Sequence, residues 1–491
     1  MKRNILKFIP GLLIITLTFQ SAVARPVARI GYFLDNSTHK HLLNPALVPH
    51  RGYLAYPGVG AFNLGFDSNL KLSTFLYPAA NAGDPLLTFL HPDVTSEQFL
   101  SQLQPNNNLD MTNRISILSM GFYAGSSFWT AELATRIKGG MNLPYGLFDF
   151  MKNGMDSPSG SSYNLANLTL GLEALAEASL GTSMKITNNF RLGVKAKYLI
   201  GLAKMTGGLD QMNISMMPDE WSVSSQGLIS MYAPKSVEFR TDADSYIDLD
   251  NGMPILYDQA VLTQLNLENF PGQGFAFDAG FHWAPFSFLQ ISAGITDIGA
   301  ITWQNSALQT YKSSASISFN GLEGLGMENS DIEDQMPDFG GMIMDMAKFK
   351  KQNTSSGDDL VQELVPTINA GVELGVLRNK LSVGVLYTNH MIKDNNLTEI
   401  TGMLNLKPGK GLNFAASYSL TNNTVNTLGL AFGLNLGLAN IFIACDRIPL
   451  DVTPPLNIDG IPIGIPLPIH TLSTNIQAGV SLSLGKMRIK K

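Results

Sequence analysis

One stretch of the chain, residues 275–303, restricts the possible folds more than any other. Apolar residues recur at every second position from Phe275 to Trp283, and the same rhythm returns from Leu289 to Ile295 after a turn at Pro285. Period two is the signature of a β-strand with one apolar face and one polar or small face. Two such runs joined by a short turn predict a β-hairpin. The open question is whether its apolar face packs inward, as in a soluble sandwich, or faces lipid.

The composition of the chain favours the second alternative, in which the apolar face contacts lipid. Charged residues make up 15% of the 491 residues, against roughly 25% in an average soluble protein. Hydrophobic residues make up 45%, yet no segment after the N-terminal leader supplies the roughly 20 apolar residues of a membrane-spanning helix. Glycine is abundant, at 46 residues. A membrane β-barrel spreads its apolar content over many alternating strands in this way. The net charge of −6 gives no electrostatic reason to expect binding to nucleic acid.

The N-terminus indicates export. Lys2, Arg3 and Lys7 precede an apolar run from Phe8 to Phe19, and a small-x-small site ends at Ala24. This arrangement is typical of a secretory signal peptide. We therefore assign residues 1–24 to the signal peptide, with cleavage after Ala24.

The next part of the chain, residues 25–110, does not read as barrel wall. Proline removes a ladder donor and is rare inside paired strands, and this part contains Pro45, Pro49, Pro57, Pro78, Pro85, Pro92 and Pro105. Its apolar residues still require burial, and the lumen of a barrel offers that space. We predict an N-terminal plug, or hatch, inside the lumen. The alternative is a small periplasmic domain.

Residues 111–491 read as the barrel with its extracellular loops. The clearest strand runs from Leu428 to Leu438, with six Leu or Phe residues at period two, and Asn188-Asn189 marks a tight turn. Short helices are predicted at Leu143–Asn153 and Asp258–Asn269. About fourteen strands are long enough to cross a membrane when tilted. The predicted fold is all-β: a transmembrane antiparallel β-barrel of about fourteen strands, closed because lipid offers an open edge no partner.

Charged residues in these strands fall on the face opposite the apolar stripe, which predicts that they face the lumen, because a charge on the lipid face is costly. The lumen-facing candidates are Glu132, Arg136, Glu173, Glu177, Lys185, Lys195, Lys197, Asp278, His282 and Glu373. One interpretation is a structural network that stiffens the wall and anchors the plug. The sharper interpretation is a path for a ligand or ion.

The sequence offers no case for an enzyme, a cofactor or a metal. Gly321–Gly326 lacks the strand-before and helix-after setting of a phosphate-binding loop. His39 and His41 are two residues apart with no nearby carboxylate pair, and nothing places a serine against His282. The single cysteine, Cys445, is read as a small lipid- or core-facing residue.

Several short motifs resemble those of FadL-like barrels. Asp297-Ile298-Gly299, followed by Ile301 and Trp303, ends a wall strand as in that superfamily, and Asn44-Pro45-Ala46 is similar to the Asn-Pro-Ala of its hatch. Further stretches resemble an uncharacterised family of Gram-negative outer-membrane proteins within that group; they are Tyr32–Leu34, Gly52-Tyr53 and Phe75–Pro78. The resemblance implies a fourteen-stranded barrel of the outer membrane with an internal N-terminal segment.

Two functions follow as hypotheses. By analogy with FadL, the first is a passive channel for hydrophobic or amphipathic small molecules, with the Pro-rich segment Asp446–His470 and Met342, Met344 and Met346 as candidate contact surfaces. The second is a structural or secretion-accessory barrel whose loops hold partner envelope proteins. A continuous cavity would favour the first hypothesis, and a plugged lumen beside an apolar loop patch the second.

Overall fold

A computed structural model describes most of the chain. The described residues are 27–34, 37–55, 60–77, 86–154, 159–234, 236–248, 255–257, 269–319, 348–353, 357–392, 396–409, 411–422, 427–448, 456–458, 461–463 and 473–485. The predicted signal peptide, residues 258–268 of the helix predicted at Asp258–Asn269, and the Met342–Met346 cluster lie outside these residues.

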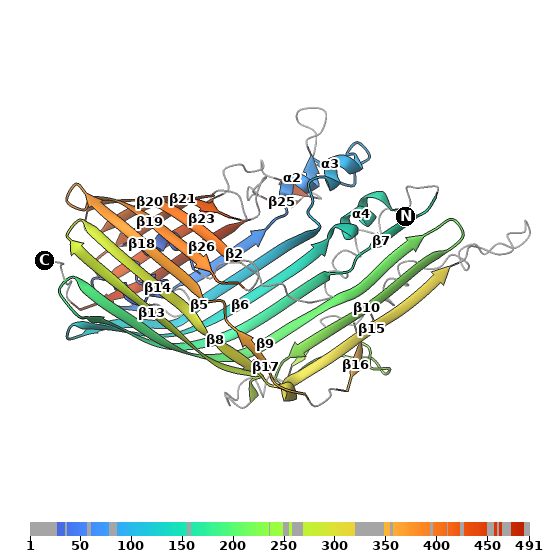
Figure 1. Ribbon diagram of the computed structural model, residues 1–491, viewed down its shortest axis with the longest axis horizontal. Coiled ribbons are helices and arrows are strands. Elements are labelled where there is room, and N and C mark those ends of the chain that lie inside the picture. Colours follow the sequence, from blue (N-terminus) through green and yellow to red (C-terminus); the bar gives the residue numbers. More distant parts are fainter. Residues whose placement is uncertain are drawn as a thin grey trace, which may run out of the picture.

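The chain forms a closed antiparallel barrel of 14 strands (Figure 1). Two short strands, β1 and β2, together form the first position in the wall, and both pair with β5 on one side and β26 on the other, which closes the ring. The wall strands, in order around the barrel, are β1 (Gly52–Ala55) with β2 (Phe62–Ser68), β5 (Asn106–Ala124), β6 (Ser127–Pro144), β8 (Leu168–Lys185), β9 (Phe190–Met216), β13 (Gly272–Phe286), β14 (Leu289–Trp303), β18 (Thr367–Val376), β19 (Leu381–His390), β20 (Leu397–Gly409), β21 (Leu412–Thr421), β22 (Thr427–Asn435), β23 (Ala439–Ile448) and β26 (Thr474–Leu484). The predicted barrel fold is confirmed.

The expectation that no part of residues 25–110 joins the wall is wrong for β1 and β2. The signal that misled is Pro57, which lies between the two strands and not inside either. A proline between two ladder segments removes no ladder donor. The part of the chain that lies inside the barrel is therefore shorter than predicted, as described below.

The residues after β2 form an outer cap and not a lumen plug, which is a second correction to the predicted hatch. The cap lies beyond the barrel, at the end opposite the short turns (Figure 1). Thr95 and Gln98 form a reciprocal capping box at the start of α3 (Ser96–Leu100). Phe99 and Phe148 are buried at the centre of the cap. Its elements are α2 (Leu72–Phe75), β3 (Leu76–Tyr77), β4 (Leu87–Thr88), α3 (Ser96–Leu100) and α4 (Tyr145–Asn153).

The helix α4 confirms the helix predicted at Leu143–Asn153. It begins after Pro144, whose fixed φ suits a helix start. Near its end, Lys152 Nζ donates to the carbonyl oxygens of Phe89 at 2.8 Å and Val94 at 2.5 Å, which fastens the helix to the cap. Burial lowers the pKa of the Lys152 ammonium.

One flank of the barrel continues well beyond the rest. The C-terminal half of β9, which we call upper β9, pairs with β10 (Trp221–Tyr232), and β10 pairs along its whole length with β15 (Leu308–Phe319). We call the sheet formed by β7 (Ser161–Asn164), upper β9, β10 and β15 the flange (Figure 1). The smaller elements nearby are β11 (Val237–Phe239), β12 (Ile255–Tyr257), η4 (Asn305–Ala307), β16 (Lys350–Gln352) and β17 (Leu360–Glu363), and a separate hairpin consists of β24 (Leu456–Ile458) and β25 (Ile461–Ile463).

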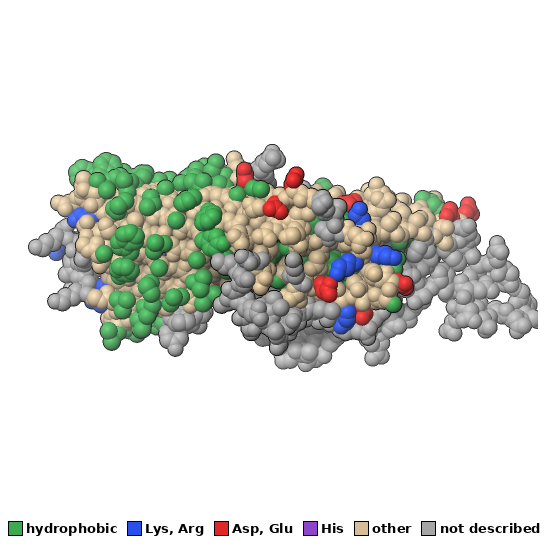
Figure 2. Space-filling model, turned by 90° about the horizontal axis from the view of Figure 1, so that it is seen from below, with side chains coloured by type: hydrophobic (Ala, Val, Ile, Leu, Met, Phe, Trp, Pro, Cys, Tyr) green, Lys and Arg blue, Asp and Glu red, His purple; other side chains and the backbone are tan. Residues whose placement is uncertain are grey.

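The apolar stripe of the wall strands faces outward. Phe277 is 58% exposed, whereas the charged Glu177 is 1% exposed and lies on the inner side. Figure 2 shows hydrophobic side chains gathered over the end of the barrel that carries the short turns, with polar and charged side chains beyond it. An apolar outer band and a polar interior are the features of a membrane barrel. No helix in the described part of the chain is long and apolar enough to span a membrane.

Candidate functional site

The lumen contains residues 27–34 and 37–50, which we call the plug segment; within it lie the short helices η1 (Arg29–Tyr32) and η2 (Lys40–Leu42). The N-terminal end of the plug segment is held by an ion pair and by hydrogen bonds to a carboxylate. Arg29 Nε lies 3.0 Å from Glu399 Oε1 on β20, and the carboxylate of Asp446 on β23 accepts the backbone N–H groups of Arg29 and Ile30 at 2.6 and 3.1 Å. A carboxylate at the first N–H groups of a helical turn satisfies donors that otherwise lack partners.

The C-terminal half of the plug segment packs directly against glycines of the barrel wall. Gly193, Gly280 and Gly294 lie side by side in register on β9, β13 and β14. A Cβ atom at Gly193 would lie 2.2 Å from the backbone N of Ala46, and one at Gly280 would lie 2.3 Å from Asn44 Oδ1. The predicted hatch motif Asn44-Pro45-Ala46 therefore approaches the wall where the wall lacks side chains.

Asn44 fixes the shape of this contact. Its Oδ1 accepts the N–H of Ala46 at 2.9 Å, which is the local turn that asparagine favours. Its Nδ2 donates to the carbonyl oxygen of Phe281 on β13 at 3.2 Å. The Asn-Pro-Ala motif thus serves as a joint between the plug segment and the wall.

A third contact of the plug segment with the wall is made by His41, which lies between Arg29 and Asn44 in the sequence. His41 Nδ1 is 2.8 Å from Lys195 Nζ on β9, and His41 Nε2 is 2.8 Å from the Tyr53 hydroxyl on β1. An ammonium can only donate, so His41 Nδ1 accepts and Nε2 donates to Tyr53. The buried imidazole links the plug segment to two wall strands, and the contact with β9 is made by the predicted candidate Lys195.

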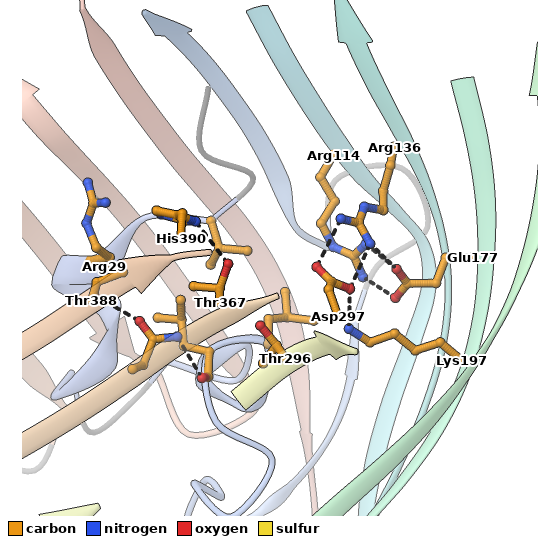
Figure 3. A pocket seen from close by; sticks show the side chains of 14 residues that line it. Arg29, Arg114, Arg136, Glu177, Lys197, Thr296, Asp297, Thr367, Thr388 and His390 are labelled. Atoms are coloured by element: carbon orange, nitrogen blue, oxygen red, sulfur yellow. Dashed lines mark hydrogen bonds and ion pairs between the residues drawn. The ribbon is translucent and has the colours of Figure 1, made fainter. Parts of the chain in front are cut away.

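Seven charged side chains from six neighbouring strands meet on the inner wall beside the plug segment. Figure 3 labels Arg114, Arg136, Glu177, Lys197 and Asp297 among them. Asp297 accepts two hydrogen bonds from Arg136, both at 3.0 Å, and one from Lys197 at 2.8 Å. Glu177 lies 3.1 Å from both Arg114 and Arg136. We call this set the charge network; its members are Arg114, Glu132, Arg136, Glu177, Lys197, Asp278 and Asp297.

Asp297 owes its place in the charge network to a β-bulge. The register between β13 and β14 shifts around Asp278, and Asp297 has a φ of 61°. Its own N–H donates to Asp278 Oδ1 at 2.9 Å. The bulge turns Asp297 inward, although strict alternation after Ile295 would point it at lipid.

The same bulge leaves a break in the wall. Pairing of β14 with β18 ends at Thr296 and Thr367, and pairing with β17 resumes at Ala300 and Glu363. Between them one backbone hydrogen bond bridges the strands, from Leu364 N to Gly299 O at 2.9 Å. Behind the break lies a polar pocket, lined by Arg29, Arg114, Arg136, Glu177, Lys197, Asp297, Thr296, Thr367, Asn369, Thr388 and His390, with Val27, Leu42 and Leu43 (Figure 3).

Apart from Lys195, which contacts His41 as described above, the predicted lumen-facing residues fall into three groups. Glu132, Arg136, Glu177, Lys197 and Asp278 belong to the charge network. Glu173 lies farther from the short turns, 3.5 Å from Lys204. Glu373 lies on β18, the neighbour of β14, opposite Gln290 and 3.6 Å from Lys407. The other two lie near the short turns: Lys185 is exposed at the end of β8, and half-buried His282 is 3.0 Å from Gln290.

Sequence reasoning missed Arg114, Asp297 and Arg29. For Asp297 a signal existed, because a carboxylate at a lipid-facing position of an alternating strand predicts a bulge. For Arg114 the same kind of bulge misled: the register shifts at Ile117, so Ser116 is buried inside while Leu118 faces outward. The partners of Arg29 lie more than 350 residues away, and no local pattern reveals them.

Within the described residues, no group of three or more His, Cys, Asp or Glu side chains is arranged to hold a metal ion. The site is a set of salt bridges between a plug segment and a barrel wall.

The fold and the site together define the class: a membrane β-barrel of the outer-membrane type whose lumen holds its own N-terminal segment. The chain belongs to a family of unknown function, DUF5723, whose model matches residues 45–446. No relative was found among curated proteins.

Solved structures with a similar arrangement include outer-membrane channels of the FadL and TodX type. The toluene transporter TodX of P. putida is 9% identical with a TM-score of 0.44, covering 91% of this chain and 94% of that one. A FadL homologue of Pseudomonas aeruginosa is 11% identical with a TM-score of 0.46, covering 95% and 99%. The predicted membership of an uncharacterised family is confirmed by the family match, and its place among FadL-like barrels stays a prediction.

Proposed function

We propose that the protein is a passive outer-membrane channel for amphipathic or hydrophobic small molecules, and that solutes leave the lumen sideways through the break between β14 and β17–β18. The observation that carries this proposal is the position of the break. A polar pocket adjoins it on the inside, and apolar Ile298 and Val361 are 43% and 64% exposed on the outside. A solute with a polar head and an apolar tail meets matching surfaces on both sides.

The break is narrow but weakly held. Three residues of β14, from Asp297 to Gly299, face Leu364–Pro366 with the single bridging hydrogen bond described above. Pro366 has no N–H to donate to a ladder. Widening the break therefore disrupts few backbone hydrogen bonds, and the fourteen-stranded wall stays closed elsewhere.

Transport is tested in proteoliposomes with a BODIPY-labelled fatty acid and a protein-free control. We place a cysteine at the lipid-facing edge of the break with Ile298→Cys, in a Cys445→Ser background, and attach a bulky maleimide. The matched control is Val383→Cys, which carries the same label on the lipid face of β19, 49% exposed and away from the break. We expect uptake to fall at least about fivefold with label at position 298 and to stay unchanged with label at 383. Wild-type uptake no faster than in protein-free vesicles would contradict the proposal.

A second function rests on the outer cap. Leu86 and Leu90 are 37% and 43% exposed at β4, beyond the apolar outer band of the barrel. Apolar side chains in such a position suit a partner envelope protein held by the loops. A photo-crosslinking residue at Leu90 in intact cells tests this function: a single defined crosslinked product favours it, and wild-type uptake after the cap is removed separates it from transport.

A further inference from the structure

The flange carries a sheet face made of uncharged polar side chains. Antiparallel register places them in three rows across neighbouring strands: Asn164–Asn213–Ser224–Ser316, Ser162–Ser215–Ser222–Ser318 and Gln211–Gln226–Ser314. We call these eleven residues the polar face. Neighbouring strands are about 4.8 Å apart and alternate residues along a strand about 6.8 Å apart, so the side chains form a regular grid.

The polar face lies on the inner side of the flange, at the end of the barrel opposite the short turns, which we call the mouth. On β10 it continues to Tyr232, which lies opposite Lys204 and packs 6.0 Å from the Trp303 ring. Lys204 in turn faces Glu173 in the lumen. The alternate residues of β10, such as Ile229 and Met231, point the other way and pack under Phe239 and Phe349. One side of the flange is thus a buried apolar layer, and the other side is open to the mouth.

The polar face is available to bind. Nine of its residues are exposed, and Ser215 and Ser222 are half-buried. Among the described residues, the side-chain hydrogen bond on this face is the one from Ala166 N to Asn164 Oδ1, at 2.8 Å. Exposed protein surface is typically about a quarter to a third charged, yet none of the eleven is. The nearest charge on the same face of β15 is Lys312, two residues below Ser314.

We propose that the polar face binds a neutral, hydroxyl-rich oligosaccharide from the outer medium at the mouth of the barrel. Hydroxyl and amide groups both donate and accept hydrogen bonds, as sugar hydroxyls do. The face offers no cation for an anionic ligand and no apolar side chain for an acyl chain. The glycan of a membrane lipid would approach from outside the barrel, where the other side of the flange is covered. The inference is independent of the transport proposal, because binding needs no flux.

The test measures binding of maltoheptaose, cellohexaose and mannohexaose to the full-length protein in nanodiscs, by saturation-transfer NMR and calorimetry. The variant is Ser224→Ala with Gln226→Ala and Ser316→Ala, which removes the centre of two rows. The matched control is Thr88→Ala with Ser101→Ala, both exposed residues of the outer cap. All substitutions are at exposed positions, and heat-dependent gel mobility verifies that each barrel is folded.

At least one of the three oligosaccharides should bind wild type and control alike, and the triple variant should bind it at least about tenfold more weakly, since each lost hydrogen bond weakens binding several-fold. Three results overturn the proposal. The first is no binding of any of the three sugars to wild type, and the second is equal affinity of the triple variant. The third is binding only of dextran sulfate or of lipopolysaccharide vesicles, which would assign recognition to Lys312 or to the lipid-facing side of the flange.

Discussion

Replacing Asp297 by Asn tests whether the charge network holds the barrel wall together. The two side chains have the same shape, and asparagine tolerates the positive φ of this bulge as aspartate does. The substitution therefore removes one negative charge and leaves the backbone conformation possible. Arg136 then loses its bidentate partner, and Lys197 loses one of two carboxylates.

The structure sets the size of the effect. Removing one partner of a buried ion pair typically costs about 3–5 kcal/mol, because the remaining charge stays buried. Arg136 keeps Glu177 at 3.1 Å and Lys197 keeps Asp278 at 2.7 Å, so neither cation is left alone. We therefore expect the free energy of unfolding to fall by about 3 kcal/mol, at the lower end of that range.

The assay is reversible guanidinium unfolding in phospholipid vesicles, followed by the fluorescence of the four tryptophans. Asp219→Asn, at an exposed site in the β9–β10 turn, is the matched control and should change stability by less than about 0.5 kcal/mol. Asp297→Gly also lacks the carboxylate and has no steric penalty at a positive φ, so a loss of stability shared by both variants is due to the lost carboxylate and not to backbone strain. If Asp297→Asn unfolds like the control, the network is not a source of stability and the argument from buried pairing is refuted.

Three further predictions follow from the same contacts. Gly280→Ala places a Cβ 2.3 Å from Asn44 Oδ1, so trypsin should cleave the displaced plug segment faster; Gly402→Ala, with no atom closer than 3.9 Å, should not change cleavage. Arg29→Met removes the cation facing Glu399 and Asp446, and hydrogen exchange over residues 27–34 should accelerate at least about tenfold while β20 stays protected. Val385→Arg, 52% exposed at the middle of a lipid-facing strand, should lower unfolding free energy in vesicles by about 2–4 kcal/mol, whereas Lys380→Arg in the adjacent turn should leave it unchanged.

The barrel was predictable because lipid enforces a strict rule on each wall strand. Every second residue must be apolar and every charge must turn inward, so the alternation from Leu428 to Leu438 is visible without knowledge of any other strand. The same rule makes its own exceptions visible. Asp297 is a charged residue at a position that alternation assigns to the lipid face, and the structure has a β-bulge at that residue.

The contents of the lumen were less predictable. Whether a charge faces inward follows from alternation, but which charges meet depends on the register of strands that are far apart in sequence, as with Arg136 and Asp297. The flange shows a second limit. Its strands alternate like wall strands, but their apolar face packs under β11 and Phe349, and period two alone does not distinguish protein cover from lipid.

The contacts of the plug segment bear on how a channel of this design would open. Withdrawing the whole segment would separate Arg29 from two buried carboxylates, break the His41–Lys195 contact and lift Asn44 from its glycine seat. Separating one buried charge pair costs about 3–5 kcal/mol, and a change of about 5.5 kcal/mol already moves a two-state equilibrium from 99:1 to 1:99. Widening the wall at Gly299 disrupts one bridging hydrogen bond, a net cost of about 1 kcal/mol. The energetics therefore favour an opening that leaves the plug segment seated, and a disulfide between Ala46→Cys and Ser183→Cys, in a Cys445→Ser background, should leave fatty-acid uptake unchanged. Uptake that stops when this disulfide forms and returns on reduction would instead show that the plug segment moves.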